Sequence, residues 1–260
     1  MSTDRKRKVK PEIQLGAVIA LILAVVVVLV FLLPGQSSQK KAEVITDKEV
    51  TIMIDPGHGG FDPGKSAPQG VKEADINLAV AKDVRDQLRE MAPNAHVLLT
   101  RDTDAVTWGT TEQDDLNART EMQETWKADY FVSIHSNSYD DASVSGYNMF
   151  IKPNDTASKQ LADNIISSFE DISWSKNNGI ITVDTSPIQI ISWSKIPAVL
   201  IEMGYMTNSS DLEGLTSPES QQTIAAAIAK GIAQTVASVQ TAPAQSSSSS
   251  DTSDASKSNE

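Results

Sequence analysis

Residues 50–60, VTIMIDPGHGG, join an apolar stretch to a glycine-rich loop. The first five of these residues are β-branched or apolar and are followed by Asp-Pro-Gly, a pattern that predicts a strand ending in a turn. The loop carries His58 just beyond that end. In open α/β sheets, functional sites lie at the carboxyl ends of the strands. This stretch therefore predicts both a strand of the sheet and one side of a site.

Helix-like and strand-like patterns alternate along the chain after this strand. Apolar residues recur every three or four positions over residues 75–91, which predicts an amphipathic helix. Similar patterns predict further strands at 96–100, 130–135, 147–151 and 198–203, and further helices at 112–126, 157–171 and 220–239. The alternation predicts an α/β fold, a single globular domain with a mostly parallel twisted sheet flanked by helices.

The composition excludes several classes of protein. The formal net charge is −12, although residues 1–14 carry five basic and two acidic side chains, so the remainder of the chain is more acidic still. An acidic surface argues against binding to nucleic acid. The chain has no cysteine, which excludes disulfides, iron–sulfur clusters and cysteine catalysis. Any zinc must therefore be held by nitrogen and oxygen ligands.

The segment before the domain predicts a membrane anchor. Residues 15–33 form an unbroken run of 19 residues without a charged or polar side chain. As a helix this run would be about 28 Å long, close to the hydrocarbon thickness of a bilayer. We expect the basic segment, residues 1–14, to stay in the cytoplasm, which makes the protein a single-pass cell-membrane protein with an extracytoplasmic domain. The alternative is a cleaved signal peptide and a secreted domain.

Two polar segments flank the predicted domain, residues 49–240. Residues 34–48 are short and polar and are expected to act as a linker. Residues 241–260 include five consecutive serines and almost nothing apolar, so they are predicted to be a disordered tail.

Candidate catalytic side chains collect near the ends of the predicted strands. His58 and His135 each follow an apolar strand, and Glu73 lies in the segment that leads from the first strand into the first helix. Two imidazoles and one carboxylate are a common ligand set for catalytic zinc. Glu202 follows a third strand and would be placed to take a proton from a water molecule at the metal. The sequence thus predicts one zinc site with Glu202 as its base.

Each of these residues also has an ordinary structural explanation. Alone, His58 would be a surface residue of a glycine-rich loop, and His135 would be a hydrogen-bonded core histidine. Glu73 would be a carboxylate favoured at a helix N-terminus. Glu202 follows three apolar residues, where a carboxylate is costly unless it is paired or functional, so a salt bridge is its alternative.

In combination, the segments resemble the zinc-dependent N-acetylmuramoyl-L-alanine amidases of the Amidase_3 family. The resemblance rests on ordered blocks at residues 52–60, 73–78, 99–101, 116–119, 128–137 and 197–208. It implies a peptidoglycan hydrolase that cuts the amide bond between N-acetylmuramic acid and L-alanine. It also implies one Zn²⁺ ion held by His58, Glu73 and His135, with Glu202 as general base and acid.

Three further residues are weaker candidates within the same blocks. Ligand histidines usually donate their second N–H to a neighbouring acceptor, and Asp55 and Asn137 are near enough in sequence to serve. Arg119 would either pair with a carboxylate of the peptide stem or form a structural ion pair, and we prefer the ion pair.

The spacing of the blocks bears on regulation. Some family members carry a helical insertion between the second histidine and the catalytic glutamate that blocks the zinc until a partner removes it. Only 66 residues separate His135 from Glu202 here, so we expect an open site and no required activator. Two other functions stay open, a zinc peptidase or carboxypeptidase acting within the stem peptide and a non-catalytic wall-binding module.

Overall fold

The computed structural model describes residues 49–241. Its strands are β1 (Val50–Pro56), β2 (Ala95–Leu99), β3 (Tyr130–Asn137), β4 (Tyr147–Ile151), β5 (Asn177–Thr182) and β6 (Ala198–Tyr205). Its helices are α2 (Glu73–Met91), α3 (Glu112–Thr125), α4 (Thr156–Asp171), α5 (Gln189–Ser192), α6 (Ser209–Thr216) and α7 (Pro218–Thr241). The predicted elements are all present, with ends that differ by one or two residues.

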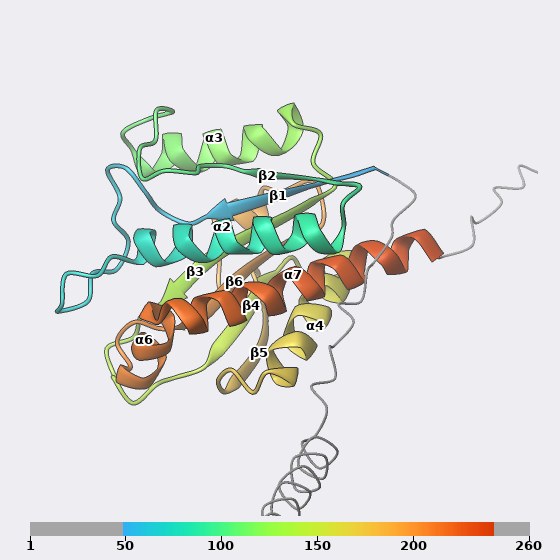
Figure 1. Ribbon diagram of the computed structural model, residues 1–260. Helices are drawn as coiled ribbons and strands as arrows, with labels where there is room; N and C mark the ends of the chain where they lie inside the picture. Colours follow the sequence, from blue (N-terminus) through green and yellow to red (C-terminus); the bar gives the residue numbers. More distant parts are fainter. Residues whose placement is uncertain (1–48, 242–260) are drawn as a thin grey trace, which may run out of the picture. The chain divides into compact units, whose positions relative to one another are not determined.

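One sheet with the strand order β2-β1-β3-β6-β4-β5 forms the centre of the domain (Figure 1). The pairs β1–β2, β1–β3, β3–β6 and β4–β5 are parallel, whereas β4 runs antiparallel to β6. The prediction of an α/β domain with a mostly parallel sheet is confirmed. The carboxyl ends of β1, β3 and β6 consequently lie at one edge of the sheet.

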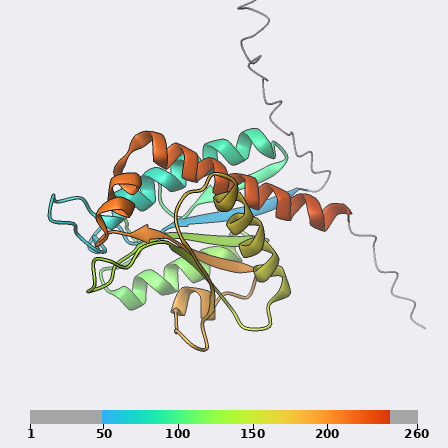
Figure 2. The ribbon, with the colours of Figure 1, turned by 90° about the horizontal axis from the view of Figure 1, so that it is seen from below.

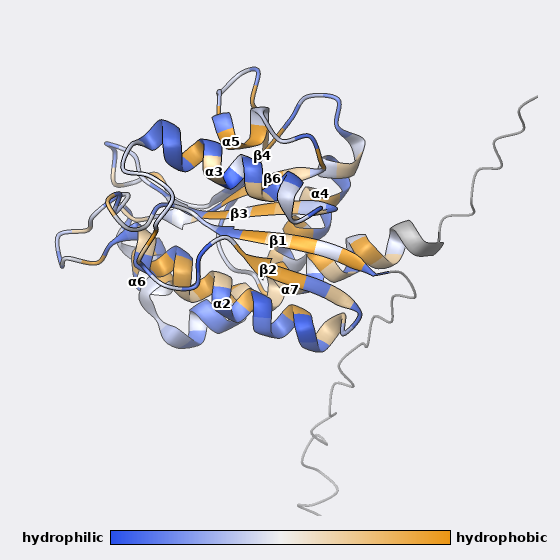
Figure 3. Cartoon of the chain, turned by 90° about the horizontal axis from the view of Figure 1, so that it is seen from above, coloured by the Kyte–Doolittle hydropathy of each residue, from blue (hydrophilic) through white to orange (hydrophobic). Residues whose placement is uncertain are grey.

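Helices cover both faces of this sheet. The larger cluster of buried apolar side chains joins α2, α4 and α7 to one face, and the smaller cluster joins α3 and α5 to the other (Figure 2). The strands between the two layers are largely apolar (Figure 3). Removing this apolar surface from water is the main favourable term in folding.

Helix α2 begins where the chain leaves the glycine-rich loop. The first turn contains Glu73 and Asp75, whose charges are favoured near the positive end of a helix dipole. Ile76, Val80 and Val84 are almost fully buried against the sheet. Packing of this apolar face fixes the start of the helix, and with it the position of the Glu73 carboxylate.

The part of the chain that the structure describes has no helix long and apolar enough to cross a membrane. The predicted transmembrane segment, residues 15–33, and the linker before residue 49 lie outside the described residues, as do residues 242–260 of the predicted tail.

Candidate metal centre

The three predicted ligands converge at the edge where β1 and β3 end. His58 follows β1, Glu73 opens α2, and His135 lies in β3. The Oε1 atom of Glu73 is 3.1 Å from Nε2 of His58 and 3.1 Å from Nδ1 of His135. Among the described residues, these three form the group of histidines and acids whose donor atoms all lie within 4.8 Å of one another.

This arrangement fits a zinc ion. The donors are two imidazole nitrogens and one carboxylate oxygen, the set found in catalytic zinc sites. Their positions do not depend on adjacency in sequence, because Glu73 and His135 are 62 positions apart in the chain. Three donor atoms from separate elements of the fold thus lie close enough together to bind one cation.

Hydrogen bonds hold the Glu73 carboxylate in place. The backbone N–H of Lys65 donates to Oε2 over 3.0 Å, and that of Ser136 donates to Oε1 over 3.2 Å. The side chain of Asn77, one helical turn later, also donates to Oε1, over 3.3 Å. Asn77 was absent from our sequence prediction, although its i+4 spacing from Glu73 placed it on the same helix face.

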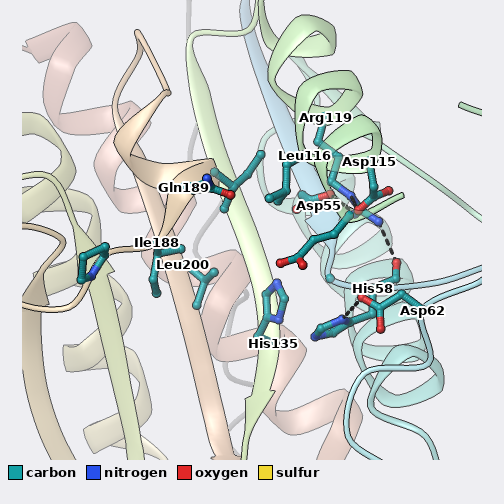
Figure 4. A pocket seen from close by; sticks show the side chains of 14 residues that line it. Asp55, His58, Asp62, Asp115, Leu116, Arg119, His135, Ile188, Gln189 and Leu200 are labelled. Atoms are coloured by element: carbon teal, nitrogen blue, oxygen red, sulfur yellow. Dashed lines mark hydrogen bonds and ion pairs between the residues drawn. The ribbon is translucent and has the colours of Figure 1, made fainter. Parts of the chain in front are cut away.

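Asp62 holds His58. The Asp62 Oδ2 atom lies 2.6 Å from Nδ1 of His58 (Figure 4). Nε2 of the same ring is therefore left to contact Glu73. The other carboxylate oxygen of Asp62 accepts a hydrogen bond from the backbone of Gly64 over 2.9 Å. An acceptor on the second nitrogen fixes the ring orientation of a ligand histidine.

The side chains of two weaker sequence candidates, Asp55 and Asn137, form hydrogen bonds to other residues than the ligand histidines. Asp55 accepts hydrogen bonds from Thr100, Ser133 and Arg119 at 2.6, 2.8 and 2.5 Å. The Asn137 side chain contacts Ser138 N and Asn148. Within the described region, neither side chain forms a hydrogen bond with a ligand histidine.

Arg119 forms the ion pair that we preferred to a substrate contact. The guanidinium is buried and pairs with Asp55 over 2.5 Å and with Asp115 over 2.8 Å. It also lies over the ring of Trp108, with its central carbon 5.6 Å from the ring centre.

The cluster is electrostatically suited to a cation. Burial opposes charging of His58, but its contacts with Glu73 and Asp62 raise its pKa to about 9. Burial likewise opposes charging of Glu73, but the hydrogen bonds from His135 and His58 hold the pKa of that carboxyl well below its usual range. Glu73 is therefore an anion at neutral pH, and a cation entering the group would displace the proton from His58.

Glu202 lies beside this group. In the parallel pairing of β3 with β6, Glu202 is the direct partner of His135. Its Oε2 atom is buried and has no hydrogen-bond partner among the described residues. Burial and the negative charge of Glu73 raise the pKa of the Glu202 carboxyl well above its usual value, against a smaller opposite effect of His58. A carboxylate in this state is a stronger base than one in water.

A cavity of about 370 Å³ opens in front of the ligands (Figure 4). His58 and His135 line one side, and Ile188, Gln189 and Leu200 line another. The remaining lining residues belong mostly to the loop after β1 and to α3: Asp55, Gly57, Asp62, Glu112, Asp115, Leu116, Arg119, Pro187 and Ile190. A substrate can therefore reach both imidazoles from this side.

Asp55 is expected to govern acid stability. Burial opposes its ionisation, but the Arg119 charge and three hydrogen bonds hold the pKa of Asp55 below its ordinary value of 3.8. A lowered carboxyl pKa adds stability above about pH 4 that is lost as pH falls through the folded value. Asp55→Asn should lower the free energy of unfolding at neutral pH by about 3 kcal/mol and flatten its decline at lower pH.

Urea unfolding of the metal-free protein, repeated between about pH 2 and pH 7, measures this effect. The matched control is Asp163→Asn, which breaks an exposed pair with Lys159 and should cost less than about 0.5 kcal/mol. Equal losses in both variants would contradict the prediction.

Gly57 packs directly against the second ligand. A Cβ at this position would lie 2.2 Å from both Nε2 and Cε1 of the His135 ring. Gly57→Ala should therefore displace the imidazole and weaken zinc binding by about tenfold or more, as measured by chelator competition. Gly70→Ala is the control for backbone strain in the same loop, because open space surrounds that position but its φ of 81° disfavours any side chain. Unchanged zinc affinity in the Gly57 variant would show that the ring tolerates the displacement.

Comparison with known proteins gives a consistent set of similarities. The profile of a family described as N-acetylmuramoyl-L-alanine amidase matches residues 52–234. The uncharacterized protein YqiI of Bacillus subtilis is 38% identical over 193 residues, which cover 74% of this chain and 86% of that protein. The N-acetylmuramoyl-L-alanine amidase CwlM of Bacillus licheniformis is 32% identical over 189 residues, which cover 71% and 68%.

Among solved structures, the CwlD amidase of Clostridioides difficile, in complex with the GerS lipoprotein, has a TM-score of 0.66 and 31% identity. The similarity covers 73% of this chain and 99% of that one. The matched region contains all three converging ligands and Glu202.

Proposed function

This chain belongs to the N-acetylmuramoyl-L-alanine amidase family, and we propose that it works through one zinc ion held by His58, Glu73 and His135, with Glu202 as general base and acid. The enzyme hydrolyses the amide bond between the lactyl group of N-acetylmuramic acid and L-alanine in peptidoglycan. The observation that carries the proposed roles is the convergence of three donor atoms within 4.8 Å beside an unpartnered buried carboxylate oxygen.

Zinc bound at this site would act as a Lewis acid and make a water molecule acidic near neutral pH. Glu202 accepts the proton of the attacking water as its oxygen bonds to the amide carbon. The same carboxyl then gives that proton to the nitrogen of L-alanine as the C–N bond breaks. Burial and the charge of Glu73 raise the pKa of Glu202 above its usual value, which strengthens the carboxylate as a proton acceptor.

Digestion of purified peptidoglycan tests this function. The full-length, zinc-loaded protein should release intact stem peptides with a free L-alanine amino group, which mass analysis identifies. Release of a terminal amino acid would instead show a peptidase that acts within the stem. Binding to wall without any product would show a non-catalytic module.

We also infer that the enzyme needs no activating partner. The segment between His135 and Glu202 consists of β4, α4, β5 and α5, and α4 packs against α7 rather than over the cavity. The related CwlD amidase was solved in complex with a lipoprotein. The activity of the purified protein without any partner is therefore the direct test. Purified protein that is inactive until a partner is added would refute the inference.

Residues 15–33 are proposed to anchor the enzyme in the cell membrane with the domain outside. The support is the length and apolarity of the run and the basic residues before it. Fractionation of cells, with protease added to intact protoplasts, tests this topology. A processed protein in the culture medium would indicate signal-peptide cleavage and secretion instead.

A further inference from the structure

Two buried arginines, Arg101 and Arg119, form hydrogen bonds to the backbone of the loop that carries His58. Arg101 donates from Nε to the carbonyl of Pro56 over 3.1 Å and from Nη2 to the carbonyl of Gly57 over 3.0 Å. Arg119 donates from Nη1 to Pro56 over 3.0 Å and from Nη2 to the carbonyl of His58 over 2.7 Å. Three consecutive carbonyl oxygens are thus held by two guanidinium groups.

The loop has an unusual backbone that needs this support. His58 has a φ of 61°, in the left-handed region that non-glycine residues rarely adopt, and Gly59 and Gly60 have φ values of 118° and 62°. Such a conformation persists only where the surroundings enforce it. The carbonyl oxygens also turn inward, where an unpaired acceptor would cost about 1–3 kcal/mol.

The same two side chains link the loop to the other ligands. Nη2 of Arg101 also donates to the carbonyl of Ala74, the neighbour of Glu73, over 2.9 Å. Arg119 pairs with Asp55, and Asp55 accepts from Ser133, two residues before His135 in β3. The segments that carry all three ligands therefore meet at these arginines.

Lysine cannot reproduce these contacts. A guanidinium has five N–H donors in a rigid planar fork, whereas an ammonium is a point charge on a flexible stem. The guanidinium of Arg101 is also tightly packed against the loop, since a Cβ on Gly59 would lie 2.6 Å from Nε of Arg101. The site thus depends on the shape of the guanidinium as well as on its charge.

We propose that Arg101 and Arg119 are positioning residues that set the affinity of the centre for zinc. This inference rests on the zinc site of the proposed function. The two arginines act through the backbone of the ligand loop, and neither belongs to the three donor residues.

The test is the dissociation constant of zinc, measured by chelator competition on full-length Arg101→Lys and Arg119→Lys proteins. Each variant should bind zinc about 10–100-fold more weakly than wild type, the usual cost of losing a residue that orients a ligand. The melting temperature of the metal-free protein is measured alongside, because a purely structural role lowers this temperature and leaves the zinc affinity of the folded protein unchanged.

Arg89→Lys is the matched control. Arg89 also donates a hydrogen bond to a backbone carbonyl, that of Val97, over 3.2 Å. Val97 lies on β2, away from the ligands. The zinc affinity of the Arg89→Lys protein should equal that of wild type. The proposal is overturned if wild type binds zinc and the folded Arg101 and Arg119 variants bind it equally well. Failure of wild type itself to bind zinc would instead overturn the proposed zinc site.

If the Arg119→Lys protein does not fold, the Asp115→Asn protein is measured in its place. That change keeps both arginines but removes the carboxylate that accepts from Nε of Arg119 over 2.8 Å. A several-fold loss of zinc affinity supports the positioning role of Arg119, and an unchanged affinity contradicts it.

Discussion

Replacing Glu202 by glutamine should lower kcat by about 10²–10⁴-fold while zinc binding stays at the wild-type level. Glutamine has nearly the same shape but cannot accept the proton of the attacking water. The buried Oε2 of Glu202 has no partner among the described residues, so its loss breaks no hydrogen bond that orders the ligands. Release of peptide from purified peptidoglycan gives the rate, and elemental analysis gives the zinc content.

Glu213→Gln is the control for this prediction, because Glu213 is exposed on α6 and away from the cavity. Its rate should match wild type. A Glu202 variant that loses zinc as completely as a ligand variant would show that Glu202 binds the metal. Full activity in that variant would assign the proton transfer to another group.

His58→Ala should abolish both zinc binding and hydrolysis. The change removes one of three donors and leaves Glu73 without one of its two imidazole partners. Lewis-acid catalysis contributes several kcal/mol to such reactions, so activity should fall by about 10³-fold or more. Wild type stripped by a chelator should lose activity equally and regain it on addition of zinc, whereas the variant should not recover.

The third histidine of the chain provides the control. His96 is exposed on β2, 3.8 Å from Glu49, and His96→Ala should keep both zinc and activity. Stoichiometric zinc in the His58 variant would contradict the ligand assignment. Activity that survives complete removal of metal would contradict the zinc mechanism as a whole.

Local pattern predicted most of the fold and the convergence of His58, Glu73 and His135 at one end of the sheet. The apolar run of β1 and the periodicity of α2 depend on neighbours in sequence, so both could be read directly. His58, His135 and Glu202 follow three apolar runs, and parallel strands end at a common edge. The positions of His58, His135 and Glu202 after these strands therefore predicted that the three side chains lie close together in the fold.

Two of the three unpredicted elements, β5 and α5, have sequences that carry little local signal, and the third is α6. β5 begins Asn-Asn-Gly, residues with low strand propensity, and it is an edge strand paired on one side only with β4. α5 is four residues long, too short for a periodic pattern. The antiparallel direction of β4 depends on how the chain crosses the sheet, which no local pattern encodes.

The sequence by itself determined the strands, the main helices and the residue types that converge at the candidate metal centre, because burial and backbone propensity act over a few neighbouring residues. Only the tertiary structure decided which side chains support that centre. Asp62 and not Asp55 contacts His58, and Arg119 reaches the loop from 61 residues away. Hydrogen-bond partners at such separations are chosen by the packing of whole elements, and packing exists only once the chain has folded.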